Sequence, residues 1–103
     1  MTLKKNERCK MVEIKIYEWC FFDREESAFH SVHSVDKAEA DRMAWDFVKA
    51  YIKELKEDFP EDFDYCSATS LKEFVKDGSC YIARVYNGGV ECFYHTINLK
   101  VGC

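Results

Sequence analysis

One long amphipathic segment, residues 37–58, most constrains how this chain can fold. Asp36 can cap the free amide groups at its start, and Pro60 ends it, because the residue before a proline is disfavoured in the helical conformation. The segment therefore predicts an α-helix of about 33 Å whose apolar face packs on another element. The apolar side chains recur every three or four residues, at Ala40, Met43, Ala44, Phe47, Val48, Tyr51, Ile52, Leu55 and Phe59.

A strand pattern precedes this helix. Val12, Ile14 and Ile16 alternate with charged residues or tyrosine, which is the period of two typical of a half-buried strand. The alternation gives way to consecutive bulky residues through Phe22, which indicates that this part is covered on both faces. Residues 28–34 are either a loop or a short strand that pairs back on the first, and we favour the strand.

Two further strands follow the helix, at residues 79–86 and 90–101. Residues 87–89, Asn-Gly-Gly, join them, and Asn-Gly between two such segments is a strong hairpin signal. The hairpin register stays open between a two-residue turn and a three-residue bulged loop. A short helix that begins after Ser70 and stops at Gly78 precedes the hairpin. This order predicts an α+β fold: an antiparallel sheet of three to four strands, in two hairpins, packed against one long helix, plus one short helix.

Length and composition predict one folded domain. The 103 residues divide into a flexible basic tail, residues 1–10, and a single α+β domain, residues 11–103. The start lacks the apolar core of a secretory signal, and no segment is long and apolar enough to span a membrane. We therefore expect a cytoplasmic protein whose six cysteines are reduced and mostly buried.

Signals for catalysis, a cofactor or a metal are weak. The six cysteines never approach CxxC spacing, so no zinc or redox motif is present. In a strand, His30 and His33 would point to opposite sides of the sheet. Cys80 would face His95 in the two-residue hairpin register, which we interpret as an ordinary cross-strand pair. The sequence thus predicts no enzyme, no cofactor and no metal. A net charge of −4 also argues against direct nucleic-acid binding.

The end of the long helix carries an unusual concentration of acids and aromatic rings. From Glu54 to Asp64 there are six acids and one base, Lys56. Acids at a helix C-terminus are unfavourable by a few tenths to about 1 kcal/mol each, because the unpaired carbonyls already carry partial negative charge. Residues that break a local preference are candidates for function. We define the acidic–aromatic surface as Glu54, Glu57, Asp58, Phe59, Glu61, Asp62, Phe63, Asp64 and Tyr65.

This surface suits a basic protein partner. Clustered carboxylates steer such a partner and can imitate a line of phosphates, while the rings can anchor in apolar pockets. The first hypothesis is therefore a small intracellular, non-enzymatic binding protein that inhibits or regulates a basic partner, including a nucleic-acid-binding protein. By analogy of size and charge, its most specific form is a counter-defence or antitoxin-like protein of phage or mobile-element origin.

The alternative hypothesis is a protein that binds or sequesters a small ligand or nucleotide. Its pocket would lie between helix and sheet or at a subunit interface, since sequestering proteins of this size often build sites by assembly. A homodimer therefore stays open, and neither hypothesis calls for a membrane. The side chains that would line the pocket are Trp19, Trp45, Arg84 and Tyr86.

Overall fold

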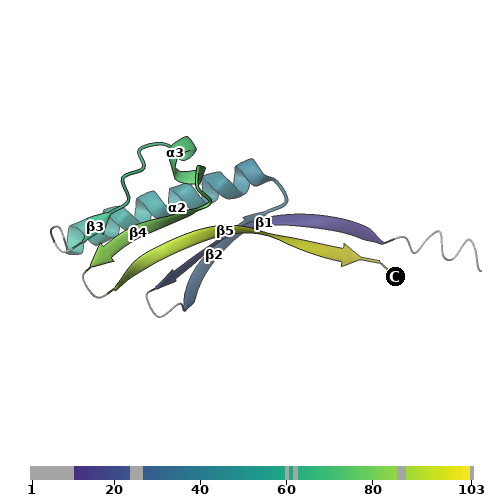
Figure 1. Cartoon of the computed structure of the whole chain (residues 1–103), viewed down its shortest axis with the longest axis horizontal. Helices are drawn as coiled ribbons and strands as arrows, with labels where there is room; N and C mark the ends of the chain where they lie inside the picture. Colours follow the sequence, from purple (N-terminus) through teal and green to yellow (C-terminus); the bar gives the residue numbers. More distant parts are fainter. Residues whose placement is uncertain (1–10, 24–26, 60, 62, 86–87, 103) are drawn as a thin grey trace, which may run out of the picture.

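The computed structural model shows an α+β fold in which one long helix lies across a curled antiparallel sheet (Figure 1). The structure describes residues 11–23, 27–59, 61, 63–85 and 88–102, so the predicted basic tail lies outside the described residues. The elements are β1 (Val12–Asp23), β2 (Ala28–Ser34), α2 (Lys37–Asp58), β3 (Asp64–Tyr65), α3 (Leu71–Val75), β4 (Ser79–Val85) and β5 (Gly88–Val101).

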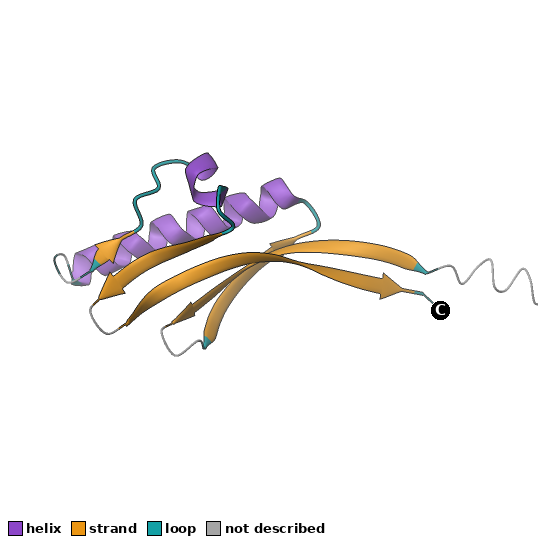
Figure 2. Ribbon diagram, in the orientation of Figure 1, coloured by secondary structure: helices purple, strands orange, loops and turns teal. Residues whose placement is uncertain are grey.

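The sheet has the strand order β2-β1-β5-β4-β3, and every neighbouring pair is antiparallel (Figure 2). Two hairpins, β1–β2 and β4–β5, lie side by side and are joined through β1 and β5. The predicted fold class is confirmed, but the predicted three to four strands is wrong, because the described residues form five. The extra strand, β3, is only Asp64 and Tyr65, paired with Arg84 and Ala83, and two residues are too short to leave a sequence pattern.

The long helix begins and ends where its periodicity predicts. The Asp36 carboxylate accepts a hydrogen bond from the Ala38 amide at 3.0 Å, and α2 continues to Asp58. Its predicted apolar face is only partly buried. Ala44 and Val48 lie in the core, whereas Phe59, the residue after the helix, is 45% exposed. The apolar stripe is therefore longer than the surface that the sheet covers.

A buried hydrogen bond attaches the first half of α2 to the sheet. The Trp19 indole nitrogen on β1 donates to the Asp41 carboxylate at 2.9 Å, and the Lys37 ammonium lies 2.7 Å from its other oxygen. Trp19 is 1% exposed and Asp41 is 6% exposed. Phe74 of α3 stacks on the Trp19 ring with centroids 4.7 Å apart and also contacts Trp45. These contacts make Trp19 the centre of the core.

Residues 28–34 form the predicted strand, and β2 completes the edge of the sheet beside β1. Val32 lies opposite Trp19 and is buried, while His30 lies opposite Phe21 on the same side of the sheet. The His30 ring stacks on Phe47 of α2 with centroids 4.1 Å apart. The helix therefore covers β2 as well as β1.

The register of the β4–β5 hairpin differs from both predicted versions. Val85 lies opposite Gly88, so Gly88 and Gly89 belong to β5, while residues 86–87 lie outside the described residues. A side chain at Gly89 would collide with the Ala83 carbonyl oxygen, which explains glycine within the strand. With an irregularity between Tyr81 and Ala83, Cys80 faces Cys92. The predicted pairing of Cys80 with His95 is therefore wrong.

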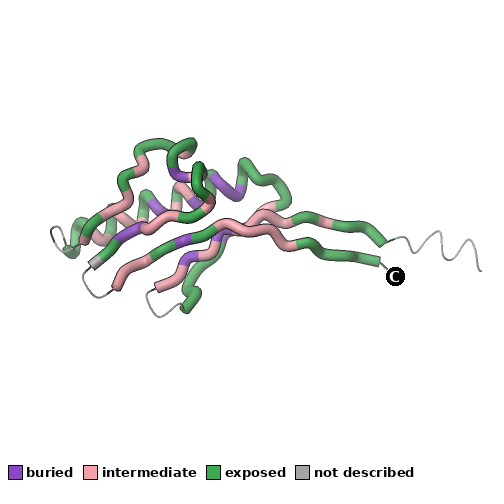
Figure 3. Tube along the Cα trace, in the orientation of Figure 1, coloured by how far each residue is buried: buried purple, intermediate pink, exposed green. Residues whose placement is uncertain are grey.

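Beyond the helix, β1 and β5 continue as a two-stranded ribbon, seen as the largely exposed arm in Figure 3. Val12 pairs with Val101 and Ile14 with Leu99, so apolar side chains line one face of this arm. Within the described residues, neither helix has the length and apolar composition that crossing a lipid bilayer requires.

Replacing Trp19 with phenylalanine should show how much the buried hydrogen bond contributes. Trp19→Phe keeps a large ring but removes the donor to Asp41. Because hydrogen bonds to charged groups contribute about 1.5–3 kcal/mol, we expect the free energy of unfolding in urea to fall by roughly that amount.

The matched control is Trp45→Phe, since Trp45 is half-buried and its indole nitrogen donates to none of the described residues. The control should lose clearly less stability than Trp19→Phe. Equal losses in the two variants would mean that the Asp41 hydrogen bond adds nothing beyond ring packing.

Candidate functional site

The three aromatic residues of the acidic–aromatic surface lie close together just after the end of α2. Tyr65 on β3 folds this stretch back, because its hydroxyl donates to the Phe59 carbonyl oxygen at 3.1 Å. The Phe63 ring lies between them, 5.8 Å from the Phe59 ring and 6.0 Å from the Tyr65 ring. Asp62 lies outside the described residues. The other acids of the surface are all exposed: Glu54, Glu57, Asp58, Glu61 and Asp64.

None of these acids takes part in an ion pair within the part of the chain that the structure describes. The ion pairs recorded there involve Asp41, Asp46 and Glu18, all outside the surface. Lys56, the one base of the stretch, instead places its ammonium 5.0 Å from the centre of the Tyr65 ring. The carboxylates therefore face solvent as a concentrated negative charge next to an exposed phenylalanine.

The three described side chains that were predicted to line a ligand pocket, Trp19, Trp45 and Arg84, line no common cavity. Trp19 lies in the core and lines neither of the two cavities that contain Trp45 and Arg84. Trp45 lines one cavity, of about 680 Å³, together with Lys49, Lys53 and other residues of α2. Arg84 lines the other, of about 560 Å³, and Tyr86 lies outside the described residues.

The cavity beside Arg84 combines a cation, carboxylates and thiols. The Arg84 guanidinium lies 3.6 Å from the centre of the Tyr81 ring, and the Tyr81 hydroxyl donates to the Tyr65 carbonyl oxygen at 3.3 Å. Glu73 and Glu91 contribute carboxylates to the lining. A small polar molecule could bind here through charge and stacking.

Three cysteines line this cavity, and two of them touch. The Sγ atoms of Cys66 and Cys80 lie 2.9 Å apart, and Cys92 faces Cys80 across the strands. Burial, followed by the hydrogen bond with Cys66, raises the pKa of Cys80 well above its ordinary value, and burial raises the pKa of Cys92 to about 12. At neutral pH both groups are thiols rather than thiolates, so neither is an activated nucleophile.

The contact between Cys66 and Cys80 predicts which disulfide forms first under oxidation. Oxidised glutathione should link these two sulfurs and release two molecules of reduced glutathione. A bridge closing a loop of this size stabilises by about 3 kcal/mol in the chain-entropy model, so the melting temperature should rise. Peptide mapping by mass spectrometry identifies the bridge.

Cys20→Ser should leave this disulfide intact, and Cys80→Ser should abolish it. A first disulfide that involves Cys20 or Cys92 would contradict the observed arrangement of the thiols.

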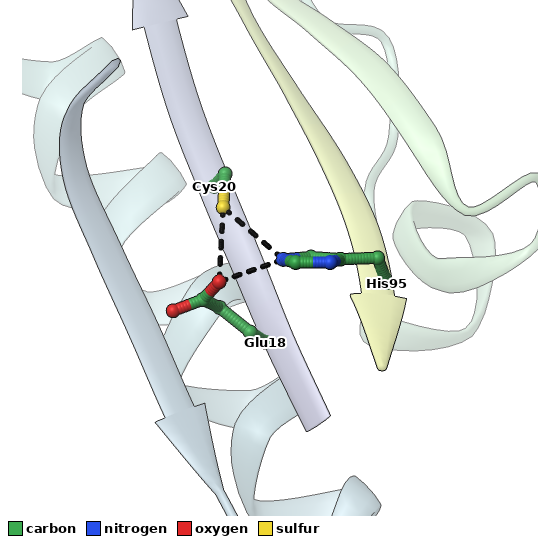
Figure 4. Close-up of side chains that lie close together, drawn as sticks. All are labelled: Glu18, Cys20 and His95. Atoms are coloured by element: carbon green, nitrogen blue, oxygen red, sulfur yellow. Dashed lines mark hydrogen bonds and ion pairs between the residues drawn. The ribbon is translucent and has the colours of Figure 1, made fainter. Parts of the chain in front are cut away.

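A second cluster lies on the face of the sheet that α2 does not cover (Figure 4). Trp19 points into the core, so its neighbours Glu18 and Cys20 point to the opposite face. His95 of β5 lies directly opposite Glu18, and its Nε2 atom is 2.6 Å from Glu18 Oε1. The Cys20 Sγ atom is 3.3 Å from the same oxygen and 3.5 Å from His95 Nε2. His33 of β2 lies opposite Glu18 on the other side.

The electrostatics of this cluster favour an ionised Glu18 and a protonated Cys20. Burial alone would raise the pKa of Glu18, but hydrogen bonds from His95 and Cys20 and the charges of the histidines lower it below its ordinary value. Burial and the neighbouring Glu18 carboxylate raise the pKa of Cys20 to about 11. The free protein thus has a carboxylate that accepts from a thiol and an imidazole.

Sequence reasoning missed this cluster because the pairing of β1 with β5 was not predicted. His95 is 75 positions from Cys20 and 77 positions from Glu18 in the sequence, and only the pairing of the two strands brings them together. One signal was available: Glu18 and Cys20 are two apart in a predicted strand, and this spacing places both on one face. Nothing in the local sequence indicated that His95 lies beside them.

No protein-family model, curated protein or solved structure matches this chain. The functional argument therefore depends on the residues, distances and charges of the chain itself.

Proposed function

We propose that this chain is a cytoplasmic, non-enzymatic binding protein that engages a basic protein partner through the acidic–aromatic surface. The observation that carries the proposal is a set of exposed carboxylates with no ion-pair partner among the described residues, adjacent to Phe59, which is 45% exposed. Charge of one sign in one region accelerates association with an oppositely charged partner.

The helix itself adds to the negative electrostatic potential of the acidic–aromatic surface. The C-terminus of α2 carries partial negative charge from its last carbonyls, and Glu57 and Asp58 stand in the same turn. Carboxylates at this spacing can occupy sites on a partner that otherwise bind phosphates. The charge pattern therefore favours a nucleic-acid-binding protein as the partner, and binding would inhibit or regulate that partner.

Phe59 supplies the apolar part of the surface. Its ring contacts Phe63 on one side and is open to solvent on the other. A large aromatic side chain surrounded by polar groups is the usual composition of an interface anchor, because burying it excludes water from the neighbouring contacts. The proposed division of roles is that the acids steer the encounter and Phe59 retains the bound partner.

Neutralising two acids tests the steering role. In Glu57→Gln/Asp58→Asn the association rate constant for the partner, captured from cells that natively express the chain, should fall by at least about tenfold at low salt. The free energy of unfolding should stay the same or rise by a few tenths to about 1 kcal/mol, because repulsion at the helix end is relieved.

The matched control, Glu13→Gln/Asp46→Asn, removes the same charge from exposed positions outside the surface. It should leave the association rate close to that of the unmodified protein. Equal losses of rate in the two double variants would show that net charge acts alone and that the surface is not the binding site.

Phe59→Ser tests the anchoring role separately. Because interface mutations of this kind act mainly on dissociation, the dissociation rate constant should rise while the association rate constant changes little. Unchanged dissociation would remove Phe59 from the interface, and a captured protein without a basic surface would contradict the proposal as a whole.

A small-ligand function remains the second candidate, because of the cavity that Arg84 and Tyr81 line. Arg84→Gln discriminates between the two candidates. It removes the only guanidinium among the described residues that line this cavity. Arg84 is not itself a member of the acidic–aromatic surface, although it pairs with Asp64 of that surface between β3 and β4. Loss of partner capture in Arg84→Gln, with capture retained in Glu57→Gln/Asp58→Asn, would favour the cavity.

A further inference from the structure

The cluster on the open face of the sheet contains a sulfur, a nitrogen and an oxygen in mutual contact. Cys20, His95 and Glu18 each offer one such atom, and all three atoms lie within 4.8 Å of one another. They project from β1 and β5 toward a common point, as Figure 4 shows. We propose that these three side chains bind a divalent transition-metal ion of the zinc type, independently of the acidic–aromatic surface.

The distances fit a tetrahedral ion with little rearrangement. With metal bonds of about 2.3 Å to sulfur and about 2.1 Å to nitrogen and oxygen, ligand atoms at tetrahedral angles lie about 3.6 Å apart when sulfur is one of the pair, and about 3.4 Å apart otherwise. The observed separations from Cys20 Sγ are 3.5 Å to His95 and 3.3 Å to Glu18. Only the His95–Glu18 contact, at 2.6 Å, has to open.

That short contact is a hydrogen bond, and a metal ion replaces the proton that it shares. On binding, the Cys20 thiol releases its proton to water, and the neutral His95 ring changes tautomer, so that its proton moves from Nε2 to Nδ1 and Nε2 can bind the ion. The resulting thiolate and the Glu18 carboxylate together carry two negative charges, which balance those of a divalent cation. The site gains a bound ion and loses a proton, and no electrons are transferred.

The ligand set selects the class of metal. Calcium and magnesium prefer shells made of oxygen atoms, whereas a thiolate with an imidazole and a carboxylate suits zinc and cobalt. Three protein ligands leave a fourth coordination position. The exposed fractions of the Glu18 and His95 side chains, 17% and 39%, leave a route from solvent to that position. Water is the fourth ligand in this arrangement.

The scaffold holds the three ligands in place. Twelve successive residue pairs, from Val12–Val101 to Asp23–Val90, join β1 to β5, and Glu18–His95 lies within this ladder. Ligands on paired strands keep their geometry better than ligands on loops. The burial of Trp19 between Glu18 and Cys20 fixes the direction in which both point.

Titration of the full chain with Co²⁺, in a buffer with a non-coordinating reductant, tests the proposal. We expect a one-to-one complex with the visible bands of tetrahedral cobalt and a thiolate-to-cobalt charge-transfer band in the near ultraviolet, which Zn²⁺ displaces. Cys20→Ser should abolish the charge-transfer band. Glu18→Gln and His95→Gln should weaken binding by more than the roughly 10–100-fold typical of losing an outer-shell partner.

The control distinguishes this cluster from the other thiols. Cys80→Ser removes a sulfur from the group formed by Cys66, Cys80 and Cys92 and should leave the cobalt spectrum unchanged. Circular dichroism verifies that each variant is folded, and Glu18→Gln provides a near-isosteric variant in case Cys20→Ser unfolds. Absence of a one-to-one complex, or a spectrum that depends on Cys80 and not on Cys20, would overturn the proposal.

Discussion

The hydrogen bond from Trp19 to Asp41 is the interaction on which the rest of the arrangement depends. A buried carboxylate is costly unless it is paired and hydrogen-bonded, and Asp41 meets this requirement with one donor from β1 and one from Lys37. The pair therefore fixes both the position of α2 on the sheet and the side of β1 that faces the core. Because residues alternate along a strand, the same bond determines that Glu18 and Cys20 face away from the helix.

The sequence predicts the local elements well and the long-range contacts poorly. The bounds of α2 follow from residues within the segment and its cap at Asp36, so periodicity alone was sufficient. The β4–β5 register depends instead on a close approach between Gly89 and the Ala83 backbone, which the turn preference of Asn-Gly does not reveal. A sequence pattern describes a segment, whereas register is a property of two segments.

The two candidate sites also differ in whether they can be predicted from one segment of the sequence. The acidic–aromatic surface is nearly contiguous in the chain, so its members could be named from the sequence, and the structure adds only that Tyr65 folds back on Phe59. The cluster of Glu18, Cys20 and His95 requires the β1–β5 pairing, and no local signal joins its two halves. The predicted pocket shows the same limit of sequence reasoning, since Trp19 satisfies the pattern of a lining residue equally well when it is the centre of the core.

Three carboxylates of the described chain illustrate how structure and function can be separated. Asp41 is buried with two donors, and its position is explained by the stability of the fold. Glu18 is partly exposed and accepts from a thiol and an imidazole, so its place is explained by its immediate neighbours. Glu57 is exposed at the negative end of α2 and has no ion-pair partner among the described residues, an arrangement that costs free energy. Since no ion pair within the described fold offsets that cost, the reason for the acids at this helix end is most economically sought in a second molecule.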